Sequence, residues 1–321
     1  MQFIDLFCGI GGFREALENG GHTCVFSSDW DRDAQETYEL NYHERPTGDL
    51  CEVESTSIPR HDILCGGFPC QPFSISGNRG GFGDARGTLL HEILRIADYH
   101  NPSVLFLENV KNFVGHDGGK TLATTSRLLT KLGYQVHHSV LNASRYGVAQ
   151  KRERIYFVCF RNDLGISNFK FPEPSDDELA VEDFLLPEED PRLKDLVVNR
   201  SDLRLNEDLP TERENRPLRI GSVGKGGQGE RVYSAKGHAI TLSAFGGGIG
   251  AKTGMYWIGG KIRRLHPEEC RRIMGFPEEF QLHSRRNVCY KQFGNSVAVP
   301  VVKKIFQSIE HSLSSHSLRA A

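Results

Sequence analysis

The chain has 321 residues, of which 38% are hydrophobic and 25% are charged, so its length and apolar content suit a large domain and a smaller one. This composition excludes a disordered or collagen-like chain, and no apolar run reaches the about 18 residues that a membrane-spanning helix needs. The formal net charge of -2 gives no global sign of nucleic-acid binding, although a polyanion partner requires only one basic face.

The N-terminus enters a strand-like run, residues 2–7, without the basic segment or small-residue cleavage site of a signal peptide, so we expect a cytoplasmic protein.

A glycine turn, residues 8–12, leads from this run into a helical stretch at 13–21, and such a turn lets a ligand approach the backbone at a helix N-terminus. About twenty residues further on, Asp29 ends a second strand-like run, where a carboxylate can bond ribose hydroxyls. The glycine turn and Asp29 together predict a nucleoside cofactor. The G-x-G-G spacing weighs against a nicotinamide cofactor, and a purely structural turn is the alternative.

Strand-like and helical stretches continue to alternate through residue 110. A helix at 34–43 is followed by a strand at 62–67, a helix at 88–100 and a strand at 103–110. Such alternation predicts a parallel sheet with helices on both faces. Because ligands gather at the carboxyl ends of the strands in these sheets, we expect functional residues just after each apolar run.

The strand at 62–67 leads into Phe68-Pro69-Cys70-Gln71-Pro72, which holds a cysteine rigidly between two prolines. The chemical use of such a cysteine is as a thiolate that attacks carbon. The eight cysteines lack the paired C-x2-C spacing of a zinc site, so we expect no metal and ordinary buried thiols at most other positions. Residues 74–88 are glycine-rich and polar enough to move as a lid.

The apolar run at 103–107 ends in Glu108, which we expect at the mouth of the same crevice, buried enough to give or share a proton near neutral pH. A helix cap is the alternative role for this carboxylate. Residues 142–160 then join a basic turn containing Lys151, Arg152 and Arg154 to another apolar strand, and an arginine there could hold a phosphate or a base carbonyl.

The chain changes character after residue 172. Residues 173–190 contain nine acidic side chains and no lysine or arginine, which indicates a solvated connector. Residues 213–291 contain fifteen lysines or arginines against six glutamates, so this segment is a candidate polyanion-binding lobe, with a solvated face as the alternative. Short strand-like runs at 231–234, 239–243 and 255–260 stand between glycine-rich loops and predict a small β-rich domain. The last apolar stretch, 296–313, has helical spacing and is expected to dock on the sheet domain.

The order of motifs resembles that of the DNA cytosine C5-methyltransferases of bacterial restriction-modification type, from nearly the first residue to about residue 303. DLFCGIGGF resembles the family's cofactor loop, GGFPCQPFS its nucleophile loop, ENV its acid segment, QKRER its arginine segment, RRLHPEECRRIMGFP its late helix and QFGNSV its returning strand. Six motifs in this order are far more specific than any one alone. The resemblance implies an α/β fold: a Rossmann-like S-adenosylmethionine-dependent methyltransferase sheet domain, residues 1–182 completed by 286–321, and a smaller β-rich target recognition domain with a hinge, residues 183–285.

The resemblance also implies the reaction, a methyl transfer from S-adenosyl-L-methionine to carbon 5 of a cytosine flipped out of duplex DNA. In this scheme the Cys70 thiolate adds to C6, Glu108 acts at N3 and Arg154 holds the O2 edge, with Arg152 counted in the same catalytic group. The implied cofactor residues are Phe7, Gly9, Gly11, Gly12, Asp29, Trp30, Asp49, Pro69 and Asn295.

The implied DNA-binding residues are Ser74, Ser76, Gln228, Arg231, Thr241 and Phe245. Gln228 and Ser76 are expected to fill the gap left by the flipped cytosine, and Arg231, carried on a flexible glycine-rich arm, to read guanine. Asp29 stands where a family member has a longer glutamate, and Phe245 where it has tyrosine, so GCGC is the expected target and other short palindromes containing GC or CG are alternatives.

The expected partner is double-stranded DNA, bound by a monomer that has no membrane association. A cognate restriction endonuclease encoded alongside would act without physical association. A transfer-RNA cytosine methyltransferase on the same fold and a catalytically silent DNA-binding protein are the alternatives. The GKGGQGER and TLSAFGGG loops favour duplex DNA over transfer RNA, and the set of Cys70, Glu108 and Arg154 favours an enzyme.

Overall fold

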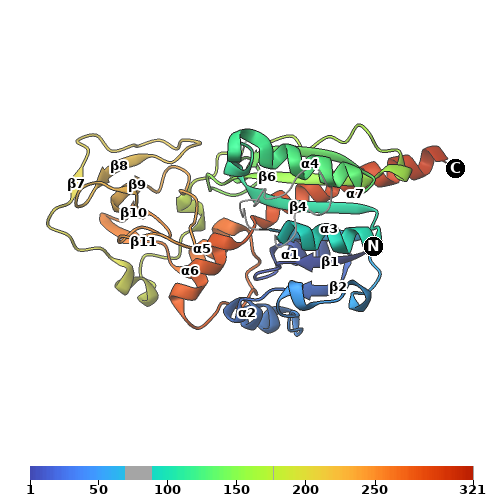
Figure 1. Ribbon diagram of the computed structural model, residues 1–321. Coiled ribbons are helices and arrows are strands. Elements are labelled where there is room, and N and C mark those ends of the chain that lie inside the picture. Colours follow the sequence, from blue (N-terminus) through green and yellow to red (C-terminus); the bar gives the residue numbers. More distant parts are fainter. Residues whose placement is uncertain (69–88, 176, 321) are drawn as a thin grey trace. The chain divides into compact units, whose positions relative to one another are not determined.

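A computed structural model describes residues 1–68, 89–175 and 177–320 of the chain, which forms two compact units (Figure 1). Unit 1 comprises Met1–Leu141, Glu153–Glu173 and Val302–Ala321, and unit 2 comprises Asn142–Arg152 and Pro174–Val301. Of the predicted site residues, Pro69, Cys70, Ser74 and Ser76 lie outside the described residues, as does the predicted lid. Within the described part of the chain, no helix is long and apolar enough to cross a membrane.

Unit 1 is built around a six-stranded sheet in the order β2-β1-β3-β4-β6-β5. Its strands are β1 (Gln2–Leu6), β2 (Thr23–Ser28), β3 (Ile63–Gly67), β4 (Val104–Val110), β5 (Tyr134–Asn142) and β6 (Glu153–Arg161). Its helices are α1 (Gly12–Glu18), α2 (Arg32–Tyr42), α3 (Leu89–His100), α4 (Lys120–Lys131) and the greater part of α7 (Val299–Ala320). Strands β1 to β4 pair in parallel and β6 runs antiparallel to β4, so the predicted alternation of strands and helices through residue 110 is confirmed.

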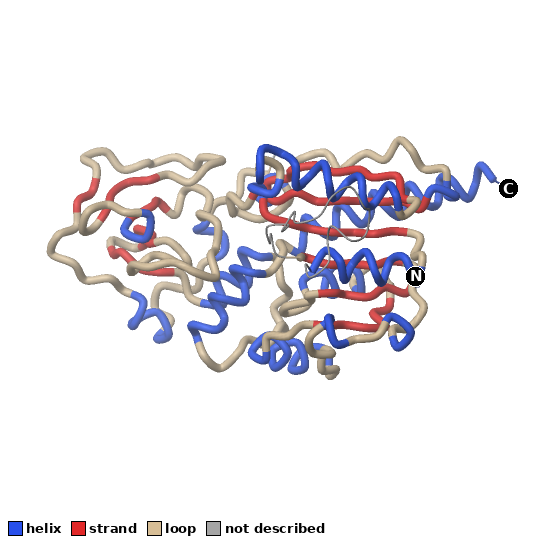
Figure 2. Tube along the Cα trace, in the orientation of Figure 1, coloured by secondary structure: helices blue, strands red, loops and turns tan. Residues whose placement is uncertain are grey.

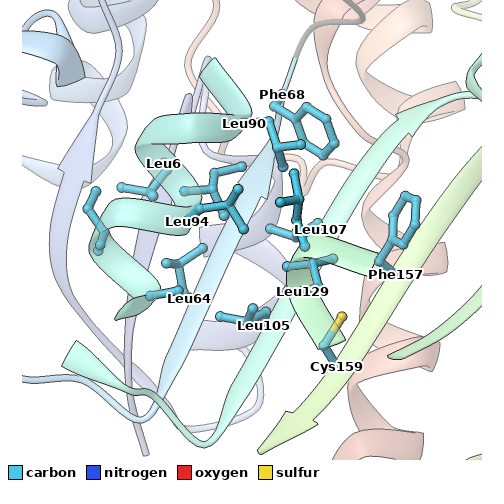
Figure 3. Packing of buried hydrophobic residues seen from close by; sticks show 14 of the residues in the cluster. Leu6, Leu64, Phe68, Leu90, Leu94, Leu105, Leu107, Leu129, Phe157 and Cys159 are labelled. Carbon is cyan, nitrogen blue, oxygen red and sulfur yellow. The ribbon is translucent and has the colours of Figure 1, made fainter. Parts of the chain in front are cut away.

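Alternate side chains of this sheet enter two separate cores, because successive residues of a strand point to opposite faces. Leu105 and Leu107 of β4 pack in the cluster that also contains Leu90 and Leu94 of α3 (Figure 3). Phe106, between them, packs edge-to-face on Phe13 of α1, with ring centroids 5.1 Å apart. Helices therefore cover both faces of the sheet, as the sequence predicts.

The C-terminal helix α7 docks on unit 1, which confirms the prediction for residues 296–313. Phe306 packs edge-to-face on His22, with ring centroids 4.8 Å apart, and the His22 ring lies 2.9 Å from a carboxylate oxygen of Glu310. Ile305 and Ile309 are fully buried, so the helix presents an apolar stripe at the expected helical spacing.

Unit 2 contains a five-stranded sheet of short strands in the order β11-β10-β9-β8-β7. Its strands are β7 (Arg204–Leu205), β8 (Arg219–Ser222), β9 (Arg231–Ser234), β10 (Met255–Ile258) and β11 (Lys261–Arg264), and its helices are α5 (Pro267–Met274) and α6 (Arg286–Asn295). Figure 2 shows the contrast between these short strands, separated by long loops, and the longer strands of unit 1. A small core of Ile220, Val223, Val232, Met255 and Ile262 supports the sheet. The prediction of a β-rich second domain is confirmed.

Two local predictions for this unit are wrong. Residues 239–243 do not form a strand, because Ala239 makes only an isolated bridge to Gln150 and the following residues bond to that segment through side chains. The QFGNSV motif is not a strand either, since residues 292–295 form the last turn of α6. Its glycine, Gly294, is accommodated in a helix because backbone from another segment packs against it.

Candidate active site

The carboxyl ends of β1 and β2 form a backbone cradle around one carboxylate. The Gly9 amide donates to Asp29 Oδ2 at 2.7 Å, and the Asp31 amide donates to Asp29 Oδ1 at 2.8 Å. Gly11 has a φ of 84°, and an added Cβ there would overlap the ring of Tyr42, whose hydroxyl donates to the Gly11 carbonyl at 3.1 Å. Glycine is therefore required at this position by both backbone conformation and space. The two backbone hydrogen bonds fix the Asp29 carboxylate at the carboxyl end of β2.

Three further predicted cofactor residues of unit 1 follow the same strand ends or are brought to them. Trp30, next to Asp29, is 78% exposed, and Phe7, at the end of β1, has a φ of 54°. Asp49 accepts a hydrogen bond from the Cys51 amide at 2.9 Å, and a bridge between Ser28 and Thr47 brings its segment to the end of β2. An exposed aromatic face beside a carboxylate held by backbone amides suits a nucleoside, which needs a stacking surface and an acceptor for its hydroxyls. The residues present therefore fit the predicted cofactor.

Glu108 and Arg154 form an ion pair on neighbouring strands. Arg154 Nε lies 3.0 Å from Glu108 Oε1, and Glu108 is 8% exposed. Glu108 belongs to β4, where it pairs with Gly67 of β3 on one side and Tyr156 of β6 on the other. A charge-assisted bond of this kind holds both groups in a fixed geometry.

Asn109, the next residue on β4, holds the end of β3. Its Nδ2 donates to the Phe68 carbonyl at 2.7 Å, and the Asn109 side chain is 1% exposed. Phe68 is the last described residue before 69–88, two residues before Cys70 in the sequence. The ENV motif therefore supplies an acid, Glu108, and an anchor, Asn109, for the segment that leads to the predicted nucleophile.

The cysteines that the structure describes are poor nucleophiles. Burial raises the pKa of the Cys8, Cys65, Cys159 and Cys270 thiols well above their usual range, and raises the pKa of Cys24 to about 12 and of Cys289 to about 11. Cys51 is exposed, yet desolvation and its neighbour Asp49 raise its pKa to about 11. None of these seven is mainly a thiolate at neutral pH, so the expectation of ordinary thiols at these positions is met.

Arg152, in unit 2, is 2% exposed and its guanidinium is occupied by backbone carbonyls. Nη1 donates to the Leu242 carbonyl at 3.2 Å, and Nη2 donates to the carbonyls of Gly294 and Ser296, the former at 2.9 Å. Asn295, the predicted cofactor residue between these two acceptors, is exposed at the end of α6. The family resemblance groups Arg152 with the catalytic residues, and the sequence does not indicate these bonds to three backbone carbonyls.

The two glycine-rich loops of unit 2 pack directly on each other. The Gly250 amide donates to the Gly229 carbonyl at 2.8 Å, and a Cβ added to Gly229 would overlap the Gly247 carbonyl. Exposed Gln228 begins a one-turn helix, Gln228–Glu230, and Arg231 follows as the first residue of β9. These contacts hold the loop before Arg231 against the second glycine-rich loop.

The second loop carries the other two predicted DNA-binding residues of this unit. Thr241 Oγ1 donates to the Lys151 carbonyl at 2.5 Å, and Phe245 is 74% exposed. Gln150 was not among the predicted site residues. It is fully buried, and its side chain accepts a hydrogen bond from the Leu242 amide at 3.2 Å. The signal for it is the Q-x-R spacing, which puts Gln150 and Arg152 on one face of an extended segment.

The family described as C-5 cytosine-specific DNA methylase matches residues 1–311. The type II methyltransferase M.HhaI of Haemophilus parahaemolyticus is 53% identical over 313 residues, which cover 98% of this chain and 95% of that protein. The type II methyltransferase M.MspI of Moraxella sp is 40% identical, over 97% of this chain and 71% of that protein.

Two solved structures show the same fold at 18% sequence identity. The Entamoeba histolytica methyltransferase EhMeth matches with a TM-score of 0.74 over 98% of both chains. The Dnmt2 methyltransferase of S. pombe matches with a TM-score of 0.70 over 96% of this chain and 97% of that one. A mixed sheet covered by helices, with a second, smaller sheet, is therefore the architecture that the chain shares with solved methyltransferases.

Proposed function

The chain belongs to the C-5 cytosine-specific DNA methylase family, and from this premise we propose that it methylates the inner cytosine of the duplex sequence GCGC. As a family member it is a DNA (cytosine-5)-methyltransferase that acts on DNA and uses S-adenosylmethionine. The choice of GCGC is supported by the 53% identity to one type II methyltransferase over 98% of this chain.

The observation that supports the proposed mechanism most directly is the ion pair of Glu108 and Arg154 beside the end of β3. Carbon 5 of cytosine is too weak a nucleophile to take a methyl group unaided. We propose that the Cys70 thiolate adds to C6 while Glu108 hydrogen-bonds or protonates N3 and Arg154 holds the O2 edge. These contacts stabilise the charge that develops in the ring as the double bond shifts and C5 becomes nucleophilic.

Bound S-adenosylmethionine supplies the electrophilic methyl group. The proposed cofactor residues of unit 1 are Phe7, Gly9, Gly11, Gly12, Asp29, Trp30 and Asp49, joined by Pro69 and by Asn295 of unit 2. Asp29 offers acceptors for ribose hydroxyls and Trp30 an exposed ring face. After methylation, a base removes the C5 proton, the Cys70–C6 bond breaks, and the thiolate leaves as the aromatic double bond is restored.

The reaction requires the target cytosine to leave the duplex, at a cost of a few kcal/mol for unstacking and unpairing. We propose that Gln228 and Ser76 occupy the gap and that Arg231 reads a guanine. Ser74, Thr241 and Phe245 complete the proposed DNA contacts. In this division of roles, residues 1–182 with 286–321 carry catalysis and cofactor binding, and residues 183–285 carry target recognition and the hinge.

We further propose that the enzyme works as a monomer on bacterial DNA in the cytoplasm. A cognate restriction endonuclease, where one is encoded alongside, would share the target sequence rather than a protein interface.

The test is incubation of the purified protein with tritiated S-adenosylmethionine and either duplex DNA or transfer RNA. We expect label in 5-methylcytosine from DNA alone, and bisulfite sequencing of plasmid from expressing cells should place it at the inner cytosine of GCGC. Methylation at another context would overturn the target, and label confined to transfer RNA would overturn the proposed substrate.

A further inference from the structure

Three segments of unit 2, far apart in the sequence, meet at residues 150–152. The Lys151 amide donates to the Ala239 carbonyl at 2.9 Å, and Thr241 donates to the Lys151 carbonyl. The Leu242 amide donates to the Gln150 side chain at 3.2 Å. These bonds lay residues 239–242, at the start of the TLSAFGGG loop, along the QKRER motif.

Arg152 ties this loop to the QFGNSV motif. Its guanidinium donates to the Leu242 carbonyl from one nitrogen and to the carbonyls of Gly294 and Ser296 from the other. Arg152 is 2% exposed, so its guanidinium has little access to water. The three carbonyls supply the hydrogen bonds that water would otherwise make to this charged group. Loss of this charged donor would leave three backbone carbonyls without their partner, which is unfavourable where water cannot replace it.

Gly294 makes a second, independent contact between the same two motifs. A Cβ placed on Gly294 would lie well inside the van der Waals distance of the Ala244 nitrogen and the Ser243 carbonyl carbon. Gly294 lies in helix α6 and has no positive φ, so its lack of a side chain is required by the neighbouring loop and not by its own conformation.

We propose that Arg152 is a positioning residue, and that with Gly294 it forms a joint that sets the DNA-binding loop against the cofactor-binding segment. The joint consists of residues 150–152, 239–244 and 294–296. On one side it carries Thr241 and leads to Phe245, and on the other it carries Asn295. The inference rests on the proposed function of these three residues, and it implies that the affinities for DNA and for S-adenosylmethionine depend on one and the same structure.

The effect on KM distinguishes displacement of this joint from general destabilisation of the fold. Weaker folding reduces the amount of active enzyme, which lowers the apparent kcat and leaves the KM values of the folded fraction unchanged. Displacement of the two segments raises the KM for duplex DNA and the KM for S-adenosylmethionine together, because each segment carries a different ligand's contacts. Arg271 offers a matched control, since it is 3% exposed and its guanidinium also donates to backbone carbonyls, those of Phe276 and Pro277.

The test compares Arg152→Ala, Arg152→Lys and Gly294→Ala with Arg271→Lys and Gly115→Ala, a glycine whose added Cβ would meet nothing within 4 Å. Dissociation constants for a GCGC duplex and for S-adenosylmethionine, kcat, both KM values and the melting temperature are measured for each protein. We expect Arg152→Ala to raise both dissociation constants by roughly ten-fold or more, which corresponds to about 1.4 kcal/mol. Arg152→Lys should be intermediate, because an ammonium cannot span acceptors on two segments as a guanidinium fork does.

Gly294→Ala keeps the proposal testable where Arg152 variants fold poorly, because alanine favours the helix while its Cβ displaces the loop. We expect it to raise both dissociation constants of the folded protein, whereas the two controls leave them unchanged. The proposal is overturned if Gly294→Ala and Arg152→Lys alter only the melting temperature, or if only one of the two ligands is affected. Wild-type protein that binds both ligands but methylates no DNA would refute the proposed function and leave the joint standing.

Discussion

At the scale of single residues, the catalytic proposal depends on Glu108 as the group that meets the cytosine ring. Replacement of Glu108 by glutamine keeps the shape of the side chain and removes both its charge and its acidic proton. We expect kcat to fall by about 10²–10⁴-fold, the usual contribution of a general acid or base, while binding of duplex DNA changes little. Single-turnover methylation by Glu108→Gln is the measurement, with Glu153→Gln as the control because Glu153 lies on the same sheet and pairs with the exposed Lys111. A rate equal to that of the control would remove Glu108 from the mechanism.

Arg231 is the residue on which base recognition is proposed to depend. A guanidinium that donates to guanine O6 and N7 discriminates against other bases by about 1–3 kcal/mol. Arg231→Ala should therefore lose roughly ten- to hundred-fold in preference at one guanine position, with a much smaller effect on non-specific binding. Bisulfite profiling of the variant on a plasmid measures this. An unchanged sequence profile would refute the assignment of Arg231 and leave the catalytic proposal intact.

At the scale of elements, strand β1 contains a fully buried carboxyl group that makes stability depend on pH. Burial raises the pKa of Asp5 to about 8, partly offset by Arg14, whereas an unfolded chain ionises near pH 4. The folded state therefore holds a proton on Asp5 that the unfolded state has lost. The contribution of Asp5 to the free energy of unfolding is most favourable below about pH 4 and falls as the pH rises towards 8.

The expected slope from Asp5 is at most about 1.4 kcal/mol in the free energy of unfolding per pH unit between these values. Asp5→Asn, which cannot ionise, should remove this slope. Denaturant unfolding of both proteins between pH 5 and 8 is the measurement. Equal slopes in the two proteins would show that Asp5 ionises normally in the folded state.

Elements whose residues repeat with a clear period could be predicted from the sequence, and elements that depend on a distant partner could not. The runs that became β1 to β4 are bounded by glycine turns and alternate with amphipathic helices, so local pattern and tertiary structure agree. Residues 239–243 are as apolar and β-branched as a strand, but their hydrogen bonds go to residues 149–152, Tyr256 and Lys252 rather than to one neighbouring strand. Gly294 reads as a helix breaker until the loop that packs on it is known.

The same limit applies to the candidate site. Asp29 and Glu108 follow apolar runs and were expected at the strand ends, where the structure places them. The sequence puts Arg152 and Arg154 two residues apart in one motif and offers no way to tell them apart. Their difference arises from burial and partners, since Arg154 pairs with a carboxylate and Arg152 donates to three carbonyls.

At the scale of the whole molecule, the surplus of positive charge at residues 213–291 is expected to bind the DNA backbone. Several of these cations are already paired: Arg213 with Glu182 and Asp183, Arg216 with Glu214, Arg263 with Glu269, and Arg271 with Glu268. The phosphate contacts should therefore come from cations such as Lys225, which is exposed beside Gln228 in the GKGGQGER loop.

Counterion release makes the logarithm of the binding constant fall linearly with the logarithm of salt concentration. Lys225→Ala should reduce the magnitude of this slope by about one, and should weaken binding to all sequences about equally. Arg213→Ala is the matched control, and the slope should change little because its guanidinium faces two carboxylates. Fluorescence anisotropy across a salt series tests both. A wild-type slope near zero would contradict the DNA-binding role of the segment.

The central claim, covalent catalysis by Cys70, is tested most directly with duplex DNA that carries 5-fluorocytosine at the target position. Fluorine at C5 takes the place of the proton that must be lost before the thiolate can leave. The bond between Cys70 and C6 should therefore persist. With S-adenosylmethionine present, we expect an adduct that survives denaturation, whose mass includes one methyl group and whose peptide map places the link at Cys70. Cys70→Ser should form no adduct and should turn over at least about 10³-fold more slowly while it still binds S-adenosylmethionine. An adduct that persists in Cys70→Ser, or a link mapped to another cysteine, would contradict the account.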